Sequence, residues 1–400
     1  MTMRVGMVAG EPSGDLLAAR VIHGVREHVA DSVCEGIGGP AMQAQGLDAW
    51  HSMNVLTVFG YVDALKRMPS LLSTYRNVKS RWLAQRPDVF VGIDAPDFNL
   101  RLEHQLKQAG VPTIHFVGPS IWAWRYERIH KIRAAVSHML VLFPFEEEIY
   151  QKEGVPVTYV GHPLAQMIPM DPDRAAARQY LGVDTSARVL AMLPGSRSSE
   201  IKLLAPRFLQ AVQLLTAQDP QLQVLVPMVN ADRRREFQAL LQQYPVANCR
   251  IIDQAPTTDS AGGFATRPAA WNVMQASDAV LAASGTATLE AALFKRPMVI
   301  SYVVSPMMKR LMQWKAGSEK PSLPWVGLPN VLAREFIVPE LLQDDATPQA
   351  LAEATWRALT DDAYKQSLNR RYTEIHDSLL RDTPALVAQA IIAQAGHGTV

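Results

Sequence analysis

The chain has 400 residues, of which 48% are hydrophobic and 19% are charged, and its formal net charge is +1. These values describe a soluble globular chain long enough for two domains. They leave no global charge to attract nucleic acid, so no nucleic-acid partner is expected. Cys34 and Cys249 have neither metal-ligand spacing nor a disulfide framework, which fits a reducing cytoplasm.

Short apolar runs alternate with segments of helical period through the first half of the chain. The first run is too short for a signal peptide, and no run approaches the ~18 residues that span a bilayer. The chain is therefore expected to touch a membrane at most. The expected order is strand 5–9, helix 13–29, strand 88–93, helix 99–109, and strands 113–117 and 139–142. Such alternation predicts a parallel sheet wound on both faces.

Residues 163–172 contain three prolines and predict a linker, because proline is excluded from helix interiors and central strands. The alternation then restarts, with strands 189–193, 224–227, 250–252, 279–283 and 298–302, helices 206–218 and 233–244, and a helical end from 348 to 395. Two doubly wound domains would bind a ligand in the cleft between them. Residues 254–270 predict a mobile surface loop, for which an inert insertion is favoured over a lid.

Residues 279–290 predict a buried strand that turns through Ser284, Gly285 and Thr286 directly into a helix carrying Glu290. Glycine lets a ligand approach the backbone closely, and the free N–H groups of a helix start favour phosphate or diphosphate. The Glu290 carboxylate repels phosphate but accepts well from a pair of ribose hydroxyls. Together these features indicate a nucleoside diphosphate. The alternative is an ordinary turn capped by Ser284, with Glu290 in solvent.

The first glycine turn, AGEPSGD at residues 9–15, closes strand 5–9. It has only two glycines and does not match the G-x-G-x-x-G dinucleotide pattern, which disfavours a nicotinamide dehydrogenase. Ser13 is expected to be the helix N-cap, and a role for Ser13 in ligand binding stays equally open.

Asp94 and Asp97 follow strand 88–93, at another strand end. A sugar hydroxyl that attacks an anomeric carbon must lose its proton, and a positioned carboxylate can accept it. Asp97 is preferred as this general base, with Asp94 holding the turn, although the sequence does not decide between them. The alternative is that both are turn and cap residues.

Arg197 stands in LPGSR, in another strand-to-helix turn. A cation at a helix start is opposed by the helix dipole unless an anion joins it, so Arg197 favours a diphosphate ligand. Its guanidinium would stabilise a departing nucleoside diphosphate in place of a metal. Asp171 and Asp173 have a D-x-D spacing but lie among the linker prolines and are interpreted as a turn. No metal and no cofactor are expected, and His162 is left open as a structural or a ligand-binding residue.

A stripe of apolar residues recurs at helical spacing in residues 61–75, interleaved with lysine and arginine. Its members are Tyr61, Leu65, Met68, Leu71, Leu72 and Tyr75. The stripe indicates either an amphipathic surface on an anionic membrane or a face packed on the sheet. Pro69 predicts two short helices in place of one. Trp122 and Trp124 would line an apolar acceptor pocket or belong to the core.

The motifs of the chain resemble, in order, those of the lipid-A-disaccharide synthase family. They are AGEPSGD (9–15), GIGGP (36–40), GIDAPDFN (92–99), PSIWAWR (119–125), LFPFE (142–146), VGHPL (160–164), LPGSR (193–197), SGTATLE (284–290), LPN (328–330) and PELLQ (339–343). The resemblance implies a GT-B fold, that is, two Rossmann-like α/β domains. The implied divisions are an acceptor and membrane-facing domain 1–165, a hinge 166–187, a UDP-sugar domain 188–347, and C-terminal helices 348–400 packing back toward the first domain.

The resemblance also implies a reaction. 2,3-Diacylglucosamine would pass from UDP-2,3-diacylglucosamine to the 6-hydroxyl of 2,3-diacylglucosamine 1-phosphate (lipid X), giving a β-1,6 linkage with inversion and releasing UDP. The implied location is the cytoplasmic face of a Gram-negative inner membrane, and a homodimer is left open. Two rivals remain, a UDP-sugar epimerase on the same scaffold and a non-catalytic UDP-lipid binding protein.

Site residues carry over position by position. The catalytic pair is Asp97 and Arg197, and the donor-binding set is Glu11, Ser13, Ser196, Arg197, Ser284, Gly285, Thr286, Glu290, Asn330 and Gln343. The acceptor, acyl-chain or membrane set is the stripe of residues 61–75 together with Trp122 and Trp124. The chain departs from the family pattern at Ser198 and Arg334, where glycine is expected, at Gln166, where aspartate is expected, and at the apparent insertion 254–270.

Overall fold

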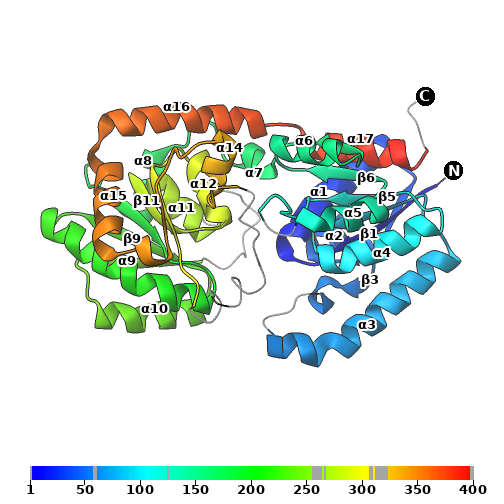
Figure 1. Ribbon diagram of the computed structural model, residues 1–400, viewed down its shortest axis with the longest axis horizontal. Coiled ribbons are helices and arrows are strands. Elements are labelled where there is room, and N and C mark those ends of the chain that lie inside the picture. The colour runs from blue at the N-terminus through cyan, green and yellow to red at the C-terminus, as the bar shows by residue number, and fades with distance from the viewer. Residues whose placement is uncertain are drawn as a thin grey trace. The chain divides into compact units, whose positions relative to one another are not determined.

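The computed structural model describes residues 2–56, 61–123, 126–254, 264, 267–305, 310 and 323–396, without the side chains of residues 61–67. The chain divides into two compact units. The first unit combines Met1–Gln166 with Leu379–Val400, and the second is Met167–Ser378. Each unit is built around one parallel sheet with helices packed on it (Figure 1).

The sheet of the first unit has the strand order β3-β2-β1-β4-β5-β6-β7. Its strands are β1 (Met3–Ala9), β2 (Ser32–Gly38), β3 (Asp48–Ser52), β4 (Val89–Ile93), β5 (Thr113–Phe116), β6 (His138–Val141) and β7 (Val157–Tyr159). Met7 and Val8 are neighbours on β1 but belong to two different apolar clusters. Because successive strand residues point to opposite faces, both faces of this sheet are buried.

Several helices of the first unit begin at a proline, which fits the first helical position because its missing N–H would be unbonded there anyway. The helices of this unit are α1 (Pro12–His28), α2 (Pro40–Ala44), α3 (Tyr61–Ala84), α4 (Pro96–Gln108), α5 (Ile129–Ala135), α6 (Pro144–Lys152), α7 (Pro163–Met167) and α17 (Thr383–Gln394). Short 3-10 turns, η1 (Met53–Val55) and η2 (Tyr126–Arg128), precede α3 and α5.

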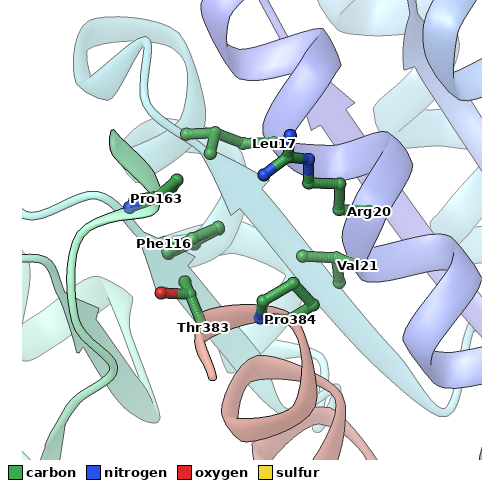
Figure 2. A pocket seen from close by; sticks show the side chains of 7 residues that line it. All are labelled: Leu17, Arg20, Val21, Phe116, Pro163, Thr383 and Pro384. Atoms are coloured by element: carbon green, nitrogen blue, oxygen red, sulfur yellow. The ribbon is translucent and has the colours of Figure 1, made fainter. Parts of the chain in front are cut away.

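Helix α17 comes from the C-terminal end of the chain and packs along α1 of the same unit (Figure 1). Figure 2 shows the seam, where Leu17 and Val21 of α1 face Thr383 and Pro384 across Phe116 of β5. The cavity left in the seam is only about 10 Å³, so it has room for no more than a water molecule. The contact is therefore a packed core interface.

The sheet of the second unit has the order β10-β9-β8-β11-β12-β13. Its strands are β8 (Val189–Leu193), β9 (Gln223–Met228), β10 (Cys249–Asp253), β11 (Ala279–Ala283), β12 (Met298–Tyr302) and β13 (Glu340–Leu342). Its helices are α8 (Arg174–Leu181), α9 (Ser198–Gln218), α10 (Ala231–Gln243), α11 (Ala269–Ala276), α12 (Thr286–Leu293), α14 (Leu328–Ala333), α15 (Pro348–Thr360) and α16 (Asp362–Leu379), with the 3-10 turn η3 (Gln343–Asp345). Helix α15 packs on α9, whereas α17 belongs to the first unit.

Two expectations based on proline are wrong. Helix α3 is continuous through Pro69, and α9 starts at Ser198 and continues through Pro206. The division between the two units, after Gln166, falls within the expected linker 163–172, which also contains the short helix α7. A proline in a helix removes one main-chain hydrogen bond, and the apolar packing of a long helix such as α9 outweighs that loss. The predicted loop 254–270 lies largely outside the described residues.

Candidate functional site

Each sheet has one point where the strand order reverses, and ligands of such sheets bind beyond the carboxyl ends of the strands there. In the first unit this point lies between β1 and β4, where Ala9 is the register partner of Ile93. In the second unit it lies between β8 and β11, where Leu193 is the partner of Ala282. The four turns that the sequence singled out follow these four strands. The turns after β1 and β4 are therefore neighbours in the first unit, and the turns after β8 and β11 are neighbours in the second unit.

The turn after β4 has a strained backbone. Asp94 and Ala95 both adopt left-handed conformations, with φ of 52° and 43°. Such a conformation costs about 1–2 kcal/mol for a residue with a Cβ, although aspartate tolerates it better than alanine. The buried Asn99 holds the turn, because its Nδ2 donates to the carbonyl oxygen of Asp94 at 2.8 Å. Strain that is held in this way is typical of a functional site.

Asp97 is placed by this turn in the first turn of α4, with its side chain 89% exposed. Its Oδ1 accepts from the guanidinium of Arg128, which is only 23% exposed. Among the described residues, no hydrogen bond engages the second oxygen, Oδ2. Asp97 can therefore accept a proton from a ligand while one of its oxygens is held in place. Sequence reasoning did not identify Arg128, because 31 positions separate the two residues.

The AGEPSGD turn contacts the Asp94 turn, since a Cβ added at Gly10 would lie 3.0 Å from the Cβ of Ala95. The expectation that Ser13 caps the helix is wrong, because the N-cap of α1 is Glu11 and Ser13 is exposed inside the first turn. Asp15 has a clear structural role. It is buried and accepts from the main-chain N–H groups of Gly39, Ala41 and Met42 at the start of α2.

In the second unit, β11 is fully buried and turns at Ser284 into α12, whose N-cap is Gly285. No side chain caps this helix, which removes the alternative that Ser284 is its cap. A Cβ placed on Gly285, where φ is +157°, would meet no atom within 4 Å. Gly285 and Thr286 are exposed. The start of α12 is thus an open set of N–H groups at the positive end of a helix dipole.

Glu290 lies one turn further along α12 and is half-buried. Burial raises the pKa of its carboxyl, and the side chain of Trp271 opposes part of that rise. The alternative of a fully solvated Glu290 is therefore wrong. A half-buried carboxyl close to an open helix start is well placed to accept from hydroxyl groups of a ligand.

The start of α9 differs from that of α12, because a side chain of the chain itself already occupies it. Glu200 accepts from the main-chain N–H groups of Ser196 and Arg197 at 2.9 and 3.1 Å. The guanidinium of Arg197 is 81% exposed and lies 3.6 Å from Glu200. The anion that offsets the cation at this helix start is therefore Glu200. A glutamate three residues after a helix N-cap is the known capping signal that the sequence reasoning passed over.

Asn330 and Gln343 have structural partners. Asn330 is buried, donates to the Val338 carbonyl and to Glu340, and accepts from the N–H groups of Ile337 and Val338. All four of its hydrogen-bonding positions are used, so the side chain acts by shaping the loop that follows α14. Gln343 adopts a left-handed backbone, and its Oε1 accepts from the N–H of Val304.

Two departures from the family pattern have a visible basis. Arg334 ends α14 in a left-handed conformation with φ of 55°, which is the position where glycine is favoured. Ser198 is the first residue of α9, and its hydroxyl donates to Glu236 of α10 at 2.8 Å. The third departure, Gln166, is exposed at the end of α7. None of these residues stands in the Asp97 turn or in the Gly285 turn.

The apolar stripe follows one continuous helix, α3. Met68 and Leu72 are 42% and 43% exposed, whereas Leu71 and Tyr75 are half-buried. The side chains of Tyr61 and Leu65 and all of Trp124 lie outside the described residues. Trp122 is buried against Phe145. Within the described residues, no helix is both long and apolar enough to cross a membrane.

Two buried ionisable groups lie near the same edge of the first sheet. Burial raises the pKa of Glu146, at the start of α6, to about 8. Burial lowers the pKa of His162 to about 4, and its Nδ1 accepts from the N–H of Leu164. His162 is therefore a satisfied structural histidine. Glu146 accepts from the N–H of Phe143 at 3.1 Å. The side chain of Trp122, in the PSIW segment, also interacts with the Glu146 carboxyl.

Solved structures with the same fold include nucleotide-sugar enzymes. The UDP-GlcNAc 2-epimerase of Neisseria meningitidis, solved with UDP-GlcNAc, matches with a TM-score of 0.62 and 12% identity over 99% of this chain and 100% of its own. A glycosyltransferase from Rickettsia africae matches with a TM-score of 0.57 and 10% identity over 99% and 98% of the two chains. At such low identity these matches report the fold alone. They confirm the expected GT-B fold.

Sequence relatives are much closer. The family model described as lipid-A-disaccharide synthetase matches residues 5–391. The lipid-A-disaccharide synthase of Bordetella avium is 68% identical over 398 residues, covering 100% of both chains. The synthase of Aromatoleum aromaticum is 49% identical over 98% of this chain and 96% of its own. The chain therefore belongs to the lipid-A-disaccharide synthase family.

Proposed function

We propose that this chain joins UDP-2,3-diacylglucosamine to the 6-hydroxyl of 2,3-diacylglucosamine 1-phosphate, with inversion at the anomeric carbon and release of UDP. Its family makes it a glycosyltransferase of lipid A biosynthesis. The observation that carries the donor assignment is the uncapped, open start of α12 at Gly285. It is the kind of site that binds a diphosphate through main-chain N–H groups.

On the donor side, the first N–H groups of α12 hold the diphosphate and Glu290 accepts from the ribose hydroxyls. Arg197 supplies an exposed guanidinium. As the bond between the sugar and the diphosphate breaks, negative charge grows on the departing UDP, and Arg197 and the helix start stabilise it. Because Glu200 already caps α9, this role rests on the guanidinium of Arg197 and on α12, not on the N–H groups of α9.

On the acceptor side, Asp97 is the general base. Its Oδ2 takes the proton from the 6-hydroxyl while that oxygen forms the new bond to the anomeric carbon on the face opposite UDP, which gives inversion. Arg128 keeps the carboxylate oriented through Oδ1. Glu11 and Ser13 stand in the turn that contacts the Asp94 turn, and a donor contact for them remains part of the proposal.

The rival reactions are separated by one incubation. An epimerase changes UDP-2,3-diacylglucosamine in the absence of an acceptor, whereas the proposed transferase releases UDP only when 2,3-diacylglucosamine 1-phosphate is added. We expect one UDP for each disaccharide formed. UDP-sugar turnover without acceptor would contradict the proposal. A non-catalytic carrier would bind the donor and release neither product.

We further propose that α3 holds the chain at the cytoplasmic face of the inner membrane through Met68 and Leu72, which are exposed on the helix surface. Replacing both with serine is expected to move the protein from sedimented anionic vesicles to the supernatant. Leu380→Ser is the matched control, because Leu380 is 42% exposed in the same unit. Equal vesicle binding by all three proteins would assign the stripe to packing. Light scattering tests the homodimer.

A further inference from the structure

A groove on the first unit runs from Asp97 along the surface between α4 and α5. It has a volume of about 480 Å³. Its walls include Asp97, Leu100 and Arg101 from α4, and Arg128 and Lys131 from the segment that forms η2 and α5. These positions recur three or four residues apart, so each helix presents one face to the groove.

Two cations of the groove are unpaired. Arg128 is engaged by Asp97. Within the described part of the chain, no ion pair or hydrogen bond engages the guanidinium of Arg101 or the ammonium of Lys131. Glu127 is the other carboxylate in the lining, so three cations face two carboxylates. The ring nitrogens of His104 at the far end are already hydrogen-bonded to Ala134 and Gln108. The groove therefore has an anion-binding excess centred on Arg101 and Lys131.

The spacing matches the proposed acceptor. Arg101 lies four residues after Asp97 on the same helix, and Lys131 lies three residues after Arg128, which is about 4.5–6 Å along the axis at a rise of about 1.5 Å per residue. In the acceptor, the attacking 6-hydroxyl and the anomeric phosphate are carried by the same sugar ring. With the hydroxyl at Asp97, one sugar length along the groove brings the phosphate to the two unpaired cations.

The acyl chains also have a path. Tyr75 of α3 donates to the carbonyl oxygen of Arg101 at 3.2 Å, and its ring meets that of Phe98 edge-on at 5.6 Å. Helix α3 therefore packs directly on the helix that carries Arg101, and the exposed Met68 and Leu72 lie on that same α3. A ligand with a phosphate at Arg101 and apolar chains directed toward α3 has the chemistry of a phosphorylated glycolipid.

We propose that this groove is the acceptor phosphate site, in which Arg101 and Lys131 bind the anomeric phosphomonoester of 2,3-diacylglucosamine 1-phosphate while Asp97 receives the proton of its 6-hydroxyl. The inference rests on the proposed function. Arginine and lysine bind a phosphomonoester by charge-assisted hydrogen bonds, which are stronger than neutral ones. The two residues bind the substrate and take no part in the proton transfer.

The test compares Arg101→Gln and Lys131→Gln with the wild type, using acceptor in non-ionic micelles and saturating donor. Each variant is expected to raise the acceptor KM about tenfold, with kcat and the donor KM unchanged. Arg133→Gln is the matched control, because it removes the same charge from α5 outside the groove lining and should leave the acceptor KM unaltered. An unchanged acceptor KM in both groove variants would overturn the assignment.

An acceptor lacking the phosphate, 2,3-diacylglucosamine, isolates the contact. The wild type is expected to bind it about tenfold more weakly than it binds the phosphorylated acceptor. The two variants should bind it as the wild type does, because without the phosphate there is no contact for the substitution to remove. If the variants bound both acceptors more weakly by the same factor, Arg101 and Lys131 would not contact the phosphate. If they kept the acceptor KM but lost binding to phosphatidylglycerol vesicles, the groove would bind lipid headgroups of the membrane, and the proposal would fail.

Acceptor binding without donor separates this inference from the proposed function. Equilibrium dialysis in the same micelles gives an acceptor Kd for each protein whether or not turnover occurs. Suppose that the wild type formed no disaccharide, and that Arg101→Gln still weakened binding of the phosphorylated acceptor but not of the acceptor without phosphate. The proposed function would then be wrong and the phosphate site would be supported. If the wild type formed disaccharide normally and the acceptor Kd were unchanged in both variants, the proposed function would be supported and the phosphate site would be wrong.

Discussion

The side-chain amide of Asn99 donates to the main-chain carbonyl oxygen of Asp94 at 2.8 Å, which holds together a turn with two left-handed residues in succession. Asn99 is fully buried, and its Nδ2 also lies 3.4 Å from the carbonyl oxygens of Val8 and Ile93. One amide therefore ties the ends of β1 and β4 to the turn that places Asp97.

Asn99→Ala removes this donor and leaves several buried carbonyl groups with one partner fewer. We expect the free energy of unfolding to fall by about 1–3 kcal/mol, and kcat to fall more than either KM, because the turn that presents Asp97 relaxes. Urea unfolding and initial rates measure the two effects. The control Asn77→Ala removes an exposed amide on α3 and should change neither. An unchanged kcat in folded Asn99→Ala would show that the turn keeps its shape without the amide.

Arg197→Gln tests the stabilisation of the leaving group. The guanidinium is exposed and its ion pair with Glu200 is long, so folding stability should change by less than about 0.5 kcal/mol. Removal of a group that stabilises transition-state charge is expected to lower kcat about 100-fold or more. Arg235→Gln, an exposed arginine on α10 in the same unit, is the control. Equal turnover by both variants would remove Arg197 from the mechanism.

Glu290→Gln tests the contact to the ribose. A carboxylate accepts from both hydroxyls of a nucleotide, and the amide replaces one acceptor oxygen with a donor. We expect the wild type to bind UDP about tenfold more tightly than 2′-deoxy-UDP, and the variant to bind both alike. Calorimetric titration gives the four dissociation constants. A variant that discriminated as well as the wild type would place the ribose elsewhere.

Glu146→Gln tests the buried carboxyl of the first unit through the pH dependence of stability. In the folded chain burial raises its pKa from 4.5 to about 8. Between these values the folded state keeps a proton that the unfolded state has released, so the free energy of unfolding falls as pH rises, on the order of 1 kcal/mol per pH unit. The glutamine variant lacks this loss.

The measurement is the difference in urea midpoint between the wild type and Glu146→Gln at about pH 5 and about pH 8.5. Relative to the wild type, the urea midpoint of Glu146→Gln should be higher at about pH 8.5 than at about pH 5. His162, whose pKa burial lowers to about 4, titrates in both proteins and cancels. A difference that did not depend on pH would show that Glu146 ionises normally in the folded chain.

The parts of the fold that were predicted from the sequence are those with an unambiguous local pattern. β8, β11 and β12 are short apolar runs between turn residues, and their bounds match the structure. β2 and β3 were missed, because β2 contains glycine and a glutamate and β3 is a half-exposed edge strand without an apolar run. Glycine and charge within a buried strand, or partial burial of an edge strand, leave little signal in composition.

The site shows the same division. Asp97 and the Gly285 turn stand directly after buried strands and could be found by their position. Arg128, Arg101 and Lys131 could not, because only the packing of α4 against α5 brings them to one groove. For both Ser13 and Ser284 the residue type made a cap one of two alternatives, but the backbone places the N-caps at Glu11 and Gly285. Residue type predicts a cap less well than the position where the turn ends.

Asp97→Asn measures whether Asp97 removes the proton from the acceptor hydroxyl, and Asp94→Asn is the matched control. Asparagine tolerates the left-handed backbone of position 94, so the control should fold. With both purified lipid substrates, Asp97→Asn is expected to lose about 100-fold to 10,000-fold in disaccharide formation while it binds UDP as the wild type does, and Asp94→Asn should stay within about tenfold. Full turnover by Asp97→Asn, or a loss confined to Asp94→Asn, would show that Asp97 is not the general base.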